Sequence, residues 1–406
     1  MRLRTLLISV FCILAYSACE NGTFSGGNEL LSLRCQTDWS GKDKELWILV
    51  TDKDGRIIAE REESGGDIIK IVKPVWFSNY ERYNLTIIRY AQSLTRIVTY
   101  ADLPVGLNWF INDWDSTSPD LSISLREKAS CTNLRFATNK AEHNSSQYDK
   151  LISIKYQGPL PTCLLVTTNY KTGNSYKWHS NLGLVKPFEF ICDDLEPMTP
   201  HLVDLNESLT DIELVGSGHI HKGLYGHGFQ FVSQEARQTE NGLLQIETPE
   251  GIFQDYSIYI TQWKNGRGRS FFNFGSIPTV VELPNTQITY VPQQLNDYEL
   301  TTSEPSDMVQ SSWRYATSNS TKIDWQVYGR GATKSSSFKL TDMPQVISEN
   351  YSGINFSDID LYRIRTRTTK IGQAQRGYLD YFMKELVNNV YYSGLRQYGV
   401  IENYNY

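Results

Sequence analysis

The densest group of side chains able to do chemistry is a glycine- and histidine-rich stretch, residues 216–228. Three of the six histidines in the chain lie in this stretch and span nine residues: His219, His221 and His227. If His219 and His221 lie on a strand, their spacing of two places both on one face, where they could share a metal ion. His227 could then supply a third ligand and leave one position for water, as catalytic zinc sites do. A zinc-dependent hydrolase is therefore one hypothesis.

The same stretch also supports a plainer interpretation. It contains five glycines, so backbone freedom is its most evident property. We therefore expect a loop with solvated histidines and no cofactor, and we keep zinc binding as the alternative.

Other catalytic signatures are missing from the sequence. Ser217 has Val215 and His219 at the positions where a nucleophile elbow needs glycine. No glycine-rich turn of the phosphate- or dinucleotide-binding type opens a helix after a strand. Carboxylate pairs occur at 193–194 and at 358 and 360, but such pairs are frequent and no facing partner suggests glycoside hydrolysis. We expect no catalytic residues.

Two tryptophans are candidates for ligand binding. Trp109 and Trp114 lie in a short run together with asparagine and aspartate. Aromatic faces beside amide and carboxylate groups suit sugar rings. The alternative is an aromatic plug between the first two domains.

The six cysteines of the chain divide into two groups. Cys12 and Cys19 lie in the N-terminal segment described below. The other four cysteines are an even number in an exported chain, which permits disulfides with three possible pairings. Buried free thiols are the alternative for Cys163 and Cys192. The four candidates are Cys35, Cys131, Cys163 and Cys192.

The N-terminus predicts export. Arg2 and Arg4 precede a short apolar run that ends in small residues at Ser17 and Ala18, which is the pattern of a secretory signal. The run is shorter than the roughly 20 apolar residues needed to span a membrane. Residues 1–18 are therefore predicted to be a signal peptide.

The segment Tyr16-Ser-Ala-Cys19 resembles the lipobox of bacterial lipoproteins, although an aliphatic residue is commoner at the position of Tyr16. The resemblance implies cleavage before Cys19 and attachment of acyl chains such as palmitate to that cysteine. Two or more acyl chains anchor a protein stably, since each buried methylene contributes about 0.8 kcal/mol. The polar and glycine-rich residues that follow, within 19–39, predict a flexible tether. The chain further resembles the uncharacterised multi-domain β-sandwich lipoproteins of the Bacteroidetes, which implies the outer membrane of a Gram-negative cell envelope.

Charge and composition narrow the partners. The chain carries 39 Lys and Arg against 45 Asp and Glu, a net charge of −6, which becomes −8 once Arg2 and Arg4 leave with the signal. With no basic patch, nucleic acid is not an expected partner. The 25 tyrosines and 9 tryptophans favour strands, so much of the aromatic content is expected in sheet packing.

Short strands separated by turns predict a mainly β fold of tandem immunoglobulin-like β-sandwich domains. Residues 40–115 form the first sandwich, which includes a hairpin with Asp-Gly at 54–55. Residues 116–300 form a β-rich region, as one unit or as two sandwiches; similar segments at 168–173 and 261–266 favour two, unless both are simply hairpin tips. Residues 301–406 form a β domain with one C-terminal α-helix. That helix is predicted over 373–392, where apolar residues recur every three and four positions.

Together these patterns predict a non-catalytic envelope lipoprotein that binds a glycan or another envelope protein, or acts as a scaffold for it. This expectation depends on architecture and on missing motifs, which is an associational argument. Two alternatives remain. One is the metal-dependent hydrolase described above. The other is a subunit of a surface fibre or adhesin, which would exchange strands between chains.

Overall fold

Strands dominate the described part of the chain. The computed structural model describes residues 28–35, 44–63, 68–79, 81–91, 93–111, 120–127, 132–138, 142–144, 151–155, 163–170, 173–180, 188–190, 195–222, 228–236, 238–239, 241–317, 320–331, 336–369 and 397–404. Strands make up 67% of the structure and helices 4%, which confirms the predicted mainly β fold.

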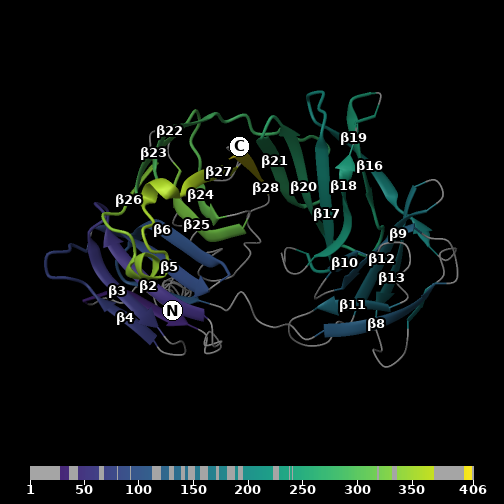
Figure 1. The fold of residues 1–406 in the computed structure, drawn as a ribbon. Coiled ribbons are helices and arrows are strands. Elements are labelled where there is room, and N and C mark those ends of the chain that lie inside the picture. The colour runs from purple at the N-terminus through teal and green to yellow at the C-terminus, as the bar shows by residue number, and fades with distance from the viewer. Residues whose placement is uncertain are drawn as a thin grey trace, which may run out of the picture.

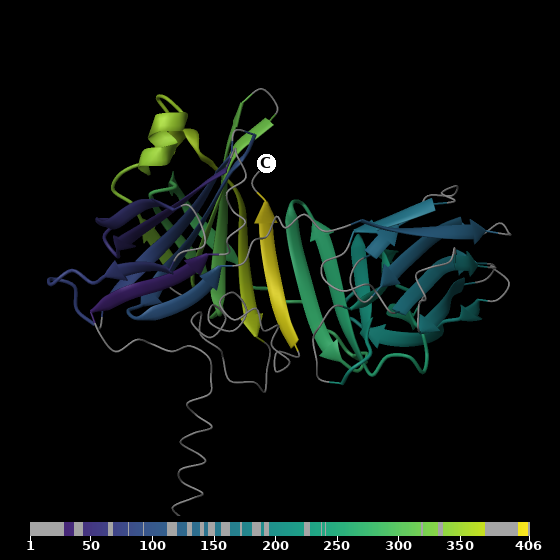
Figure 2. The same cartoon turned by 90° about the horizontal axis from the view of Figure 1, so that it is seen from below.

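One long sheet forms the backbone of the molecule. Its twelve strands follow the order β18-β17-β20-β21-β28-β27-β24-β25-β6-β5-β2-β3. The yellow strand β28 lies near the middle of this sheet, between strands from distant parts of the chain (Figures 1 and 2). The bounds are β2 (Lys44–Asp52), β3 (Ile57–Glu63), β5 (Arg82–Ala91), β6 (Thr95–Pro104), β17 (Ile212–His219), β18 (Phe229–Ala236), β20 (Asp255–Lys264), β21 (Arg267–Gly275), β24 (Met308–Thr317), β25 (Ser320–Arg330), β27 (Asp360–Thr369) and β28 (Gln397–Tyr404).

Smaller sheets surround this long sheet at both ends (Figure 1). At the β2–β3 end they are β4-β1-β7 and β22-β23-β26, and at the β17–β18 end they are β10-β9-β12-β13-β15, β11-β8-β14 and β16-β19. Their bounds are β1 (Glu29–Cys35), β4 (Ile68–Val72), β7 (Leu107–Ile111), β8 (Asp120–Glu127), β9 (Thr132–Thr138), β10 (Glu142–Asn144), β11 (Leu151–Lys155), β12 (Cys163–Tyr170), β13 (Gly173–Ser180), β14 (Phe188–Phe190), β15 (Glu196–Pro197), β16 (Thr199–Asp204), β19 (Leu243–Thr248), β22 (Ile288–Gln294), β23 (Asp297–Thr302) and β26 (Ser336–Lys339).

The described helices are short: α2 (Gln345–Asn350) and a 3-10 turn at Phe356–Asp358. The C-terminal helix predicted over 373–392 lies outside the described residues, as do the predicted signal peptide and Cys19. Within the described ranges, no helix has the length and apolar character needed to cross a membrane.

The N-terminal lobe is formed by β1–β7 together with β22–β27. In this lobe both faces of the long sheet are covered. On one face, residues of β2, β5 and β6 form a core with the sheet β4-β1-β7, centred on side chains such as Ile48, Leu85 and Leu31. On the opposite face, the sheet β22-β23-β26 and α2 cover a second core that contains Trp313 and Trp325. Strands that are covered on both faces read as near-continuous apolar runs, and Asn84–Ile88 of β5 is buried at every position.

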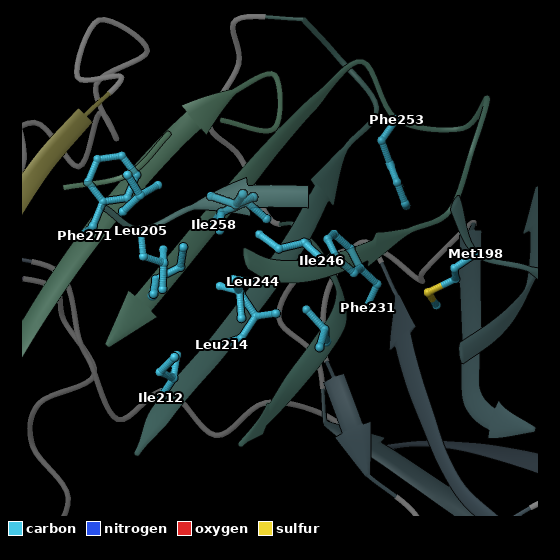
Figure 3. Packing of buried hydrophobic residues seen from close by; sticks show 14 of the residues in the cluster. Met198, Leu205, Ile212, Leu214, Phe231, Leu244, Ile246, Phe253, Ile258 and Phe271 are labelled. Carbon is cyan, nitrogen blue, oxygen red and sulfur yellow. The ribbon is translucent and has the colours of Figure 1, made fainter. Parts of the chain in front are cut away.

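The second lobe is formed by β8–β21, from the middle of the chain, and we call it the middle lobe. It is built around a third core on one face of β17, β18, β20 and β21. Leu214 of β17, Leu244 and Ile246 of β19, and Ile258 of β20 gather in this core (Figure 3). Residues of β9, β12 and β13 extend the same cluster. The opposite face of these strands carries aromatic side chains with polar neighbours, among them Tyr259 and Phe272.

Strand pairing joins segments that the sequence places in different domains. Strand β6 pairs in parallel with β25, and β21 pairs with β28. The predicted boundaries near 116 and 301 therefore do not coincide with breaks in the long sheet. Both of the similar segments, 168–173 and 261–266, fall at antiparallel hairpins, β12–β13 and β20–β21.

The predicted Asp-Gly hairpin is confirmed. Strands β2 and β3 pair antiparallel across it, and Gly55 has a φ of 88°, in the region that favours glycine. Its carbonyl accepts a hydrogen bond from the Thr341 amide at 3.3 Å. A Cβ on Gly55 would lie only 2.9 Å from Leu340 Cα, so this turn has no room for a side chain.

We expect Gly55→Ala to reduce the free energy of unfolding by about 2–4 kcal/mol, because backbone strain and a backbone clash combine. Gly353→Ala is the matched control, since Gly353 has a φ of 81° and nothing within 4 Å of its Cβ position. Only the strain remains there, at about 1 kcal/mol. Urea denaturation of both variants measures the difference, and equal losses would show that the contact with Leu340 is unimportant.

A second prediction concerns the parallel seam between β6 and β25. Trp325 Nε1 donates to Thr99 Oγ1 at 2.9 Å, and Thr99 Oγ1 is 2.8 Å from Thr86 Oγ1, with all three side chains buried. Thr99→Val leaves the indole N–H without its acceptor, so we expect a loss of about 1–3 kcal/mol in denaturation. Thr261→Val breaks a half-buried hydroxyl pair with Ser270 instead, where water can substitute, and should cost less than 1 kcal/mol. A Thr99 variant no worse than this control would contradict a special role for the seam.

Candidate functional site: an arginine and tyrosine face of the long sheet

Three arginines alternate along β27 at the centre of the long sheet. Arg363, Arg365 and Arg367 occupy every second position, so they share one face of the strand. Ile364, between two of them, points to the opposite face and joins the core that contains Trp313. The sheet thus presents a row of guanidinium groups on the face that its apolar core leaves uncovered at this strand.

A single glutamate on the neighbouring strand pairs with two of these arginines. Glu402 of β28 lies 3.3 Å from Arg363 Nη1 and 3.1 Å from Arg365 Nη2, both measured to Oε1. The Tyr404 hydroxyl also donates to Glu402 Oε1 at 3.3 Å. The Glu402 side chain is only 7% exposed, whereas that of Arg365 is 39% exposed. Two guanidinium groups therefore share one carboxylate, which leaves a local excess of positive charge.

The hydrogen bonding of this cluster is incomplete at one atom. Arg365 Nε is buried and has no hydrogen-bond partner. Arg363 differs: burial alone would lower its pKa, but the hydrogen bond with Tyr404 and the charge of Glu402 raise that pKa above its ordinary value. The Arg363 guanidinium therefore stays cationic at any physiological pH. Arg365 is thus the member of the pair with an unused donor and with access to solvent.

Aromatic rings continue the same face across three strands. Tyr259 of β20, Phe272 of β21 and Tyr398 of β28 are neighbours, with ring centroids 4.5 Å apart at each Phe272 contact. The hydroxyls of Tyr259 and Tyr398 lie 2.9 Å apart. Arg367 Cζ lies 3.9 Å from the Tyr398 ring centroid, a cation–π distance. We call this set the arginine–tyrosine face: Tyr259, Phe272, Arg363, Arg365, Arg367, Tyr398 and Glu402.

This face can recognise an anion beside a flat apolar group. Guanidinium forks bind carboxylate, phosphate and sulfate in bidentate geometry. Aromatic rings with a polar tip supply contact area at low entropic cost. The sequence signal for this site is the period-two run Arg363-Ile-Arg365-Thr-Arg367, which places three cationic side chains on one face of a strand.

The predicted histidine site begins at one end of the same face. Strand β17 ends at His219, so His221 lies beyond it, and the two side chains do not share a strand face. His219 is buried, lies 3.0 Å from Ser257 Oγ through Nε2, and packs edge-on against Phe274. His221 is exposed.

The third predicted ligand, His227, lies outside the described residues. Among the residues that the structure does describe, no three His, Cys, Asp or Glu side chains are grouped so as to hold a metal ion. The site of three histidines therefore stays a prediction.

The tryptophan and cysteine candidates fall partly outside the described residues. Trp109 is buried in the N-terminal core, edge-on to Tyr100 at 5.1 Å, while Trp114 is not described. Cys163 begins β12 and is half-buried, and Cys35 ends β1. Cys131 and Cys192 are not described, so the disulfide pairing stays a prediction.

We expect Glu402→Gln to reduce the free energy of unfolding by about 2 kcal/mol, because it leaves two partly buried guanidinium groups without their counterion. The loss is below that of a fully buried pair since water screens Arg365. Asp102→Asn is the control, as it removes the exposed ion pair with Arg330 and should cost less than 1 kcal/mol. Equal stability of wild type and Glu402→Gln would mean that the cluster is already solvated.

No protein-family model matches the chain, and no curated protein matches it. Among solved structures, the Bacillus anthracis TIE protein is 12% identical, with a TM-score of 0.15; the alignment covers 80% of this chain and 63% of that protein, which is less than two thirds of its length. The N-terminal four immunoglobulin domains of Dscam1 isoform 8.4 are 11% identical, with a TM-score of 0.14 and coverage of 79% of this chain and 99% of that one. Similarity at these TM-scores supports no conclusion about fold or function, so the mainly β fold class stands on the strands of the chain itself.

Proposed function

We propose that this chain is a lipoprotein of the cell envelope that is anchored through Cys19 and binds a ligand at a non-catalytic site. The N-terminal pattern Arg2–Cys19 supports the address, and the acyl chains would hold the protein at the outer membrane. The immunoglobulin-like character of its domains is part of the proposal. It is supported by the packing of smaller sheets against the long sheet in both lobes.

The ligand is a glycan that carries acidic groups, bound at the arginine–tyrosine face. The observation behind this choice is the sharing of Glu402 by two arginines, beside the stacked rings of Phe272 and Tyr398. A uronate or a sulfated or phosphorylated sugar offers both an anion for Arg365 and a ring for Tyr398. An acidic segment of an envelope protein would satisfy only the charge.

Binding rather than catalysis suits the groups on this face. Guanidinium groups remain protonated, so they cannot act as general acid or base near neutral pH. The tyrosines and Glu402 are engaged with each other and with the arginines. The seven side chains of the arginine–tyrosine face can therefore orient an anion but include no activated nucleophile.

Arg365→Ala should weaken binding of a polyuronate to the mature protein by about tenfold or more, because one charge-assisted hydrogen-bonding group is lost. Calorimetric titration with polygalacturonate, and with neutral dextran as the uncharged comparison, measures this. Arg330→Ala is the matched control, since Arg330 is 57% exposed, pairs with Asp102 and lies outside the arginine–tyrosine face, two strands from Arg367.

Each outcome of this titration is informative. Polyuronate binding that falls for Arg365→Ala but not for Arg330→Ala supports the proposal, and a metal chelator should leave that binding unchanged. Equal binding of dextran would remove the role of the anion. No binding of either polymer to wild type would overturn the glycan ligand.

A further inference from the structure

Most exposed large hydrophobic side chains of the described residues gather at one corner of the N-terminal lobe. Seven such side chains occur in the described part of the chain, and five of them fall between residues 57 and 76. The remaining two, Leu202 and Val280, lie in the middle lobe. The five are Ile57, Ile68, Val72, Val75 and Trp76, which we call the apolar corner.

A tight turn after β4 holds the two most prominent of these side chains outward. The Phe77 amide donates to the Pro74 carbonyl at 3.0 Å, so Val75 and Trp76 form the tip of the turn. Phe77 is 2% exposed and is part of the N-terminal core, which fixes the turn to the body. Val75 is fully exposed and Trp76 is 53% exposed. The folded core therefore maintains this exposure.

The neighbouring strand β4 extends the apolar corner along an edge. Its residues alternate between exposed and buried, with Ile68 and Val72 outward and Ile69 and Ile71 in the core. It pairs with β1 on one side only in the described sheet β4-β1-β7. Exposed edge strands normally carry charge or proline on such positions, and β4 has only Lys70 there, so the outward isoleucine and valine on either side of it indicate a surface that is covered in use.

The corner lies where the chain enters the body from its N-terminus. The Lys73 amide donates to the Asn28 carbonyl at 2.7 Å, and Glu29 pairs with Val72 in register. Asn28 follows Cys19 by nine residues. At about 3.3–3.6 Å per residue, even a fully extended segment spans at most about 30 Å. A lipid on Cys19 would therefore keep the apolar corner close to the bilayer that holds it.

Charges around the corner are nearly balanced. Lys70 Nζ lies 2.7 Å from Glu29, and Arg56 Nε lies 4.0 Å from Asp52. The Arg56 guanidinium also lies 5.4 Å from the Trp76 ring centroid. Lys73 donates to the Asn79 side chain. Attraction to a partner at this corner would thus come from apolar area more than from net charge.

We propose that the apolar corner docks on the phospholipid surface of the membrane that carries the Cys19 anchor. Val75 would enter the acyl boundary, and Trp76 would sit at the headgroup level, where tryptophan is enriched. Docking adds a second contact to the lipid anchor and orients the body on the bilayer. This inference depends on the proposed anchoring at Cys19.

The test uses the full mature chain with Cys19→Ala, so that the corner alone must bind. We expect weak flotation with vesicles of phosphatidylethanolamine and phosphatidylglycerol, reduced about tenfold by the double variant Val75→Ser/Trp76→Ser. Leu202→Ser/Val280→Ser is the matched control, because it removes two comparably exposed side chains from the other lobe. Raising sodium chloride from about 0.1 to 0.5 M should leave binding nearly unchanged, as balanced charges predict.

Several outcomes would overturn the proposal. Equal flotation of both double variants, or none for the parent chain, would show that the corner does not bind lipid. A dimer by sizing chromatography that the corner variant alone disrupts would assign the corner to a second copy. Mass spectrometry of the wild-type protein for acyl chains on Cys19 tests the anchor separately, so vesicle binding without acylation would leave docking intact and refute the anchor.

Discussion

Parallel pairing of β6 with β25 is the constraint on which the architecture depends. It joins residues near 100 to residues near 325, and the buried contact of Trp325 with Thr99 lies directly on this seam. Because parallel neighbours need a long crossover, the chain must run away from this seam after β6 and return to it at β25. The middle lobe is built within that crossover, and its strands β17, β18, β20 and β21 belong to the same long sheet. Residues 44–104 and 308–330 therefore share two hydrophobic cores, one on each face of the sheet.

The two faces of the long sheet differ in composition beyond β24. Met308 belongs to the core with β4-β1-β7, and directly opposite it in register stands Arg367, on the same face. One strand further, that face changes from apolar packing to guanidinium groups, a carboxylate and tyrosine rings. The opposite face carries the cores that contain Trp313 and Phe271, with polar side chains such as Thr366 and Asn403 on the strands between them. One sheet can thus be structural over its full width on one side and offer a binding surface over half its width on the other.

The sequence revealed what is local and concealed what is distant. Gly55 marked a hairpin because φ > 0 and an adjacent aspartate are properties of a few neighbouring residues. Pairing between β21 and β28 brings together residues more than a hundred positions apart, and no local pattern encodes that choice. The candidate site depends partly on local sequence and partly on distant strand pairing. The spacing of Arg363, Arg365 and Arg367 was visible as a period of two, but Glu402 and Tyr398 join them only through the pairing of β27 with β28. The histidine hypothesis assumed that a strand extends through His221, whereas β17 ends at His219.

The position of the apolar corner relative to the arginine–tyrosine face limits the ligands that can reach that face. The sheet β4-β1-β7 packs on the same face of the long sheet that carries Arg367 beyond β24. A body docked through the apolar corner would therefore hold its binding face on the membrane-proximal side of the sheet, or at a steep angle to the bilayer, and would not point it away into bulk solvent. A ligand confined near that membrane then meets the site at a high effective concentration, so even the modest affinity of a solvent-exposed arginine pair suffices for its capture. Surface glycans rooted in the same bilayer meet this condition, and freely diffusing oligosaccharides do not.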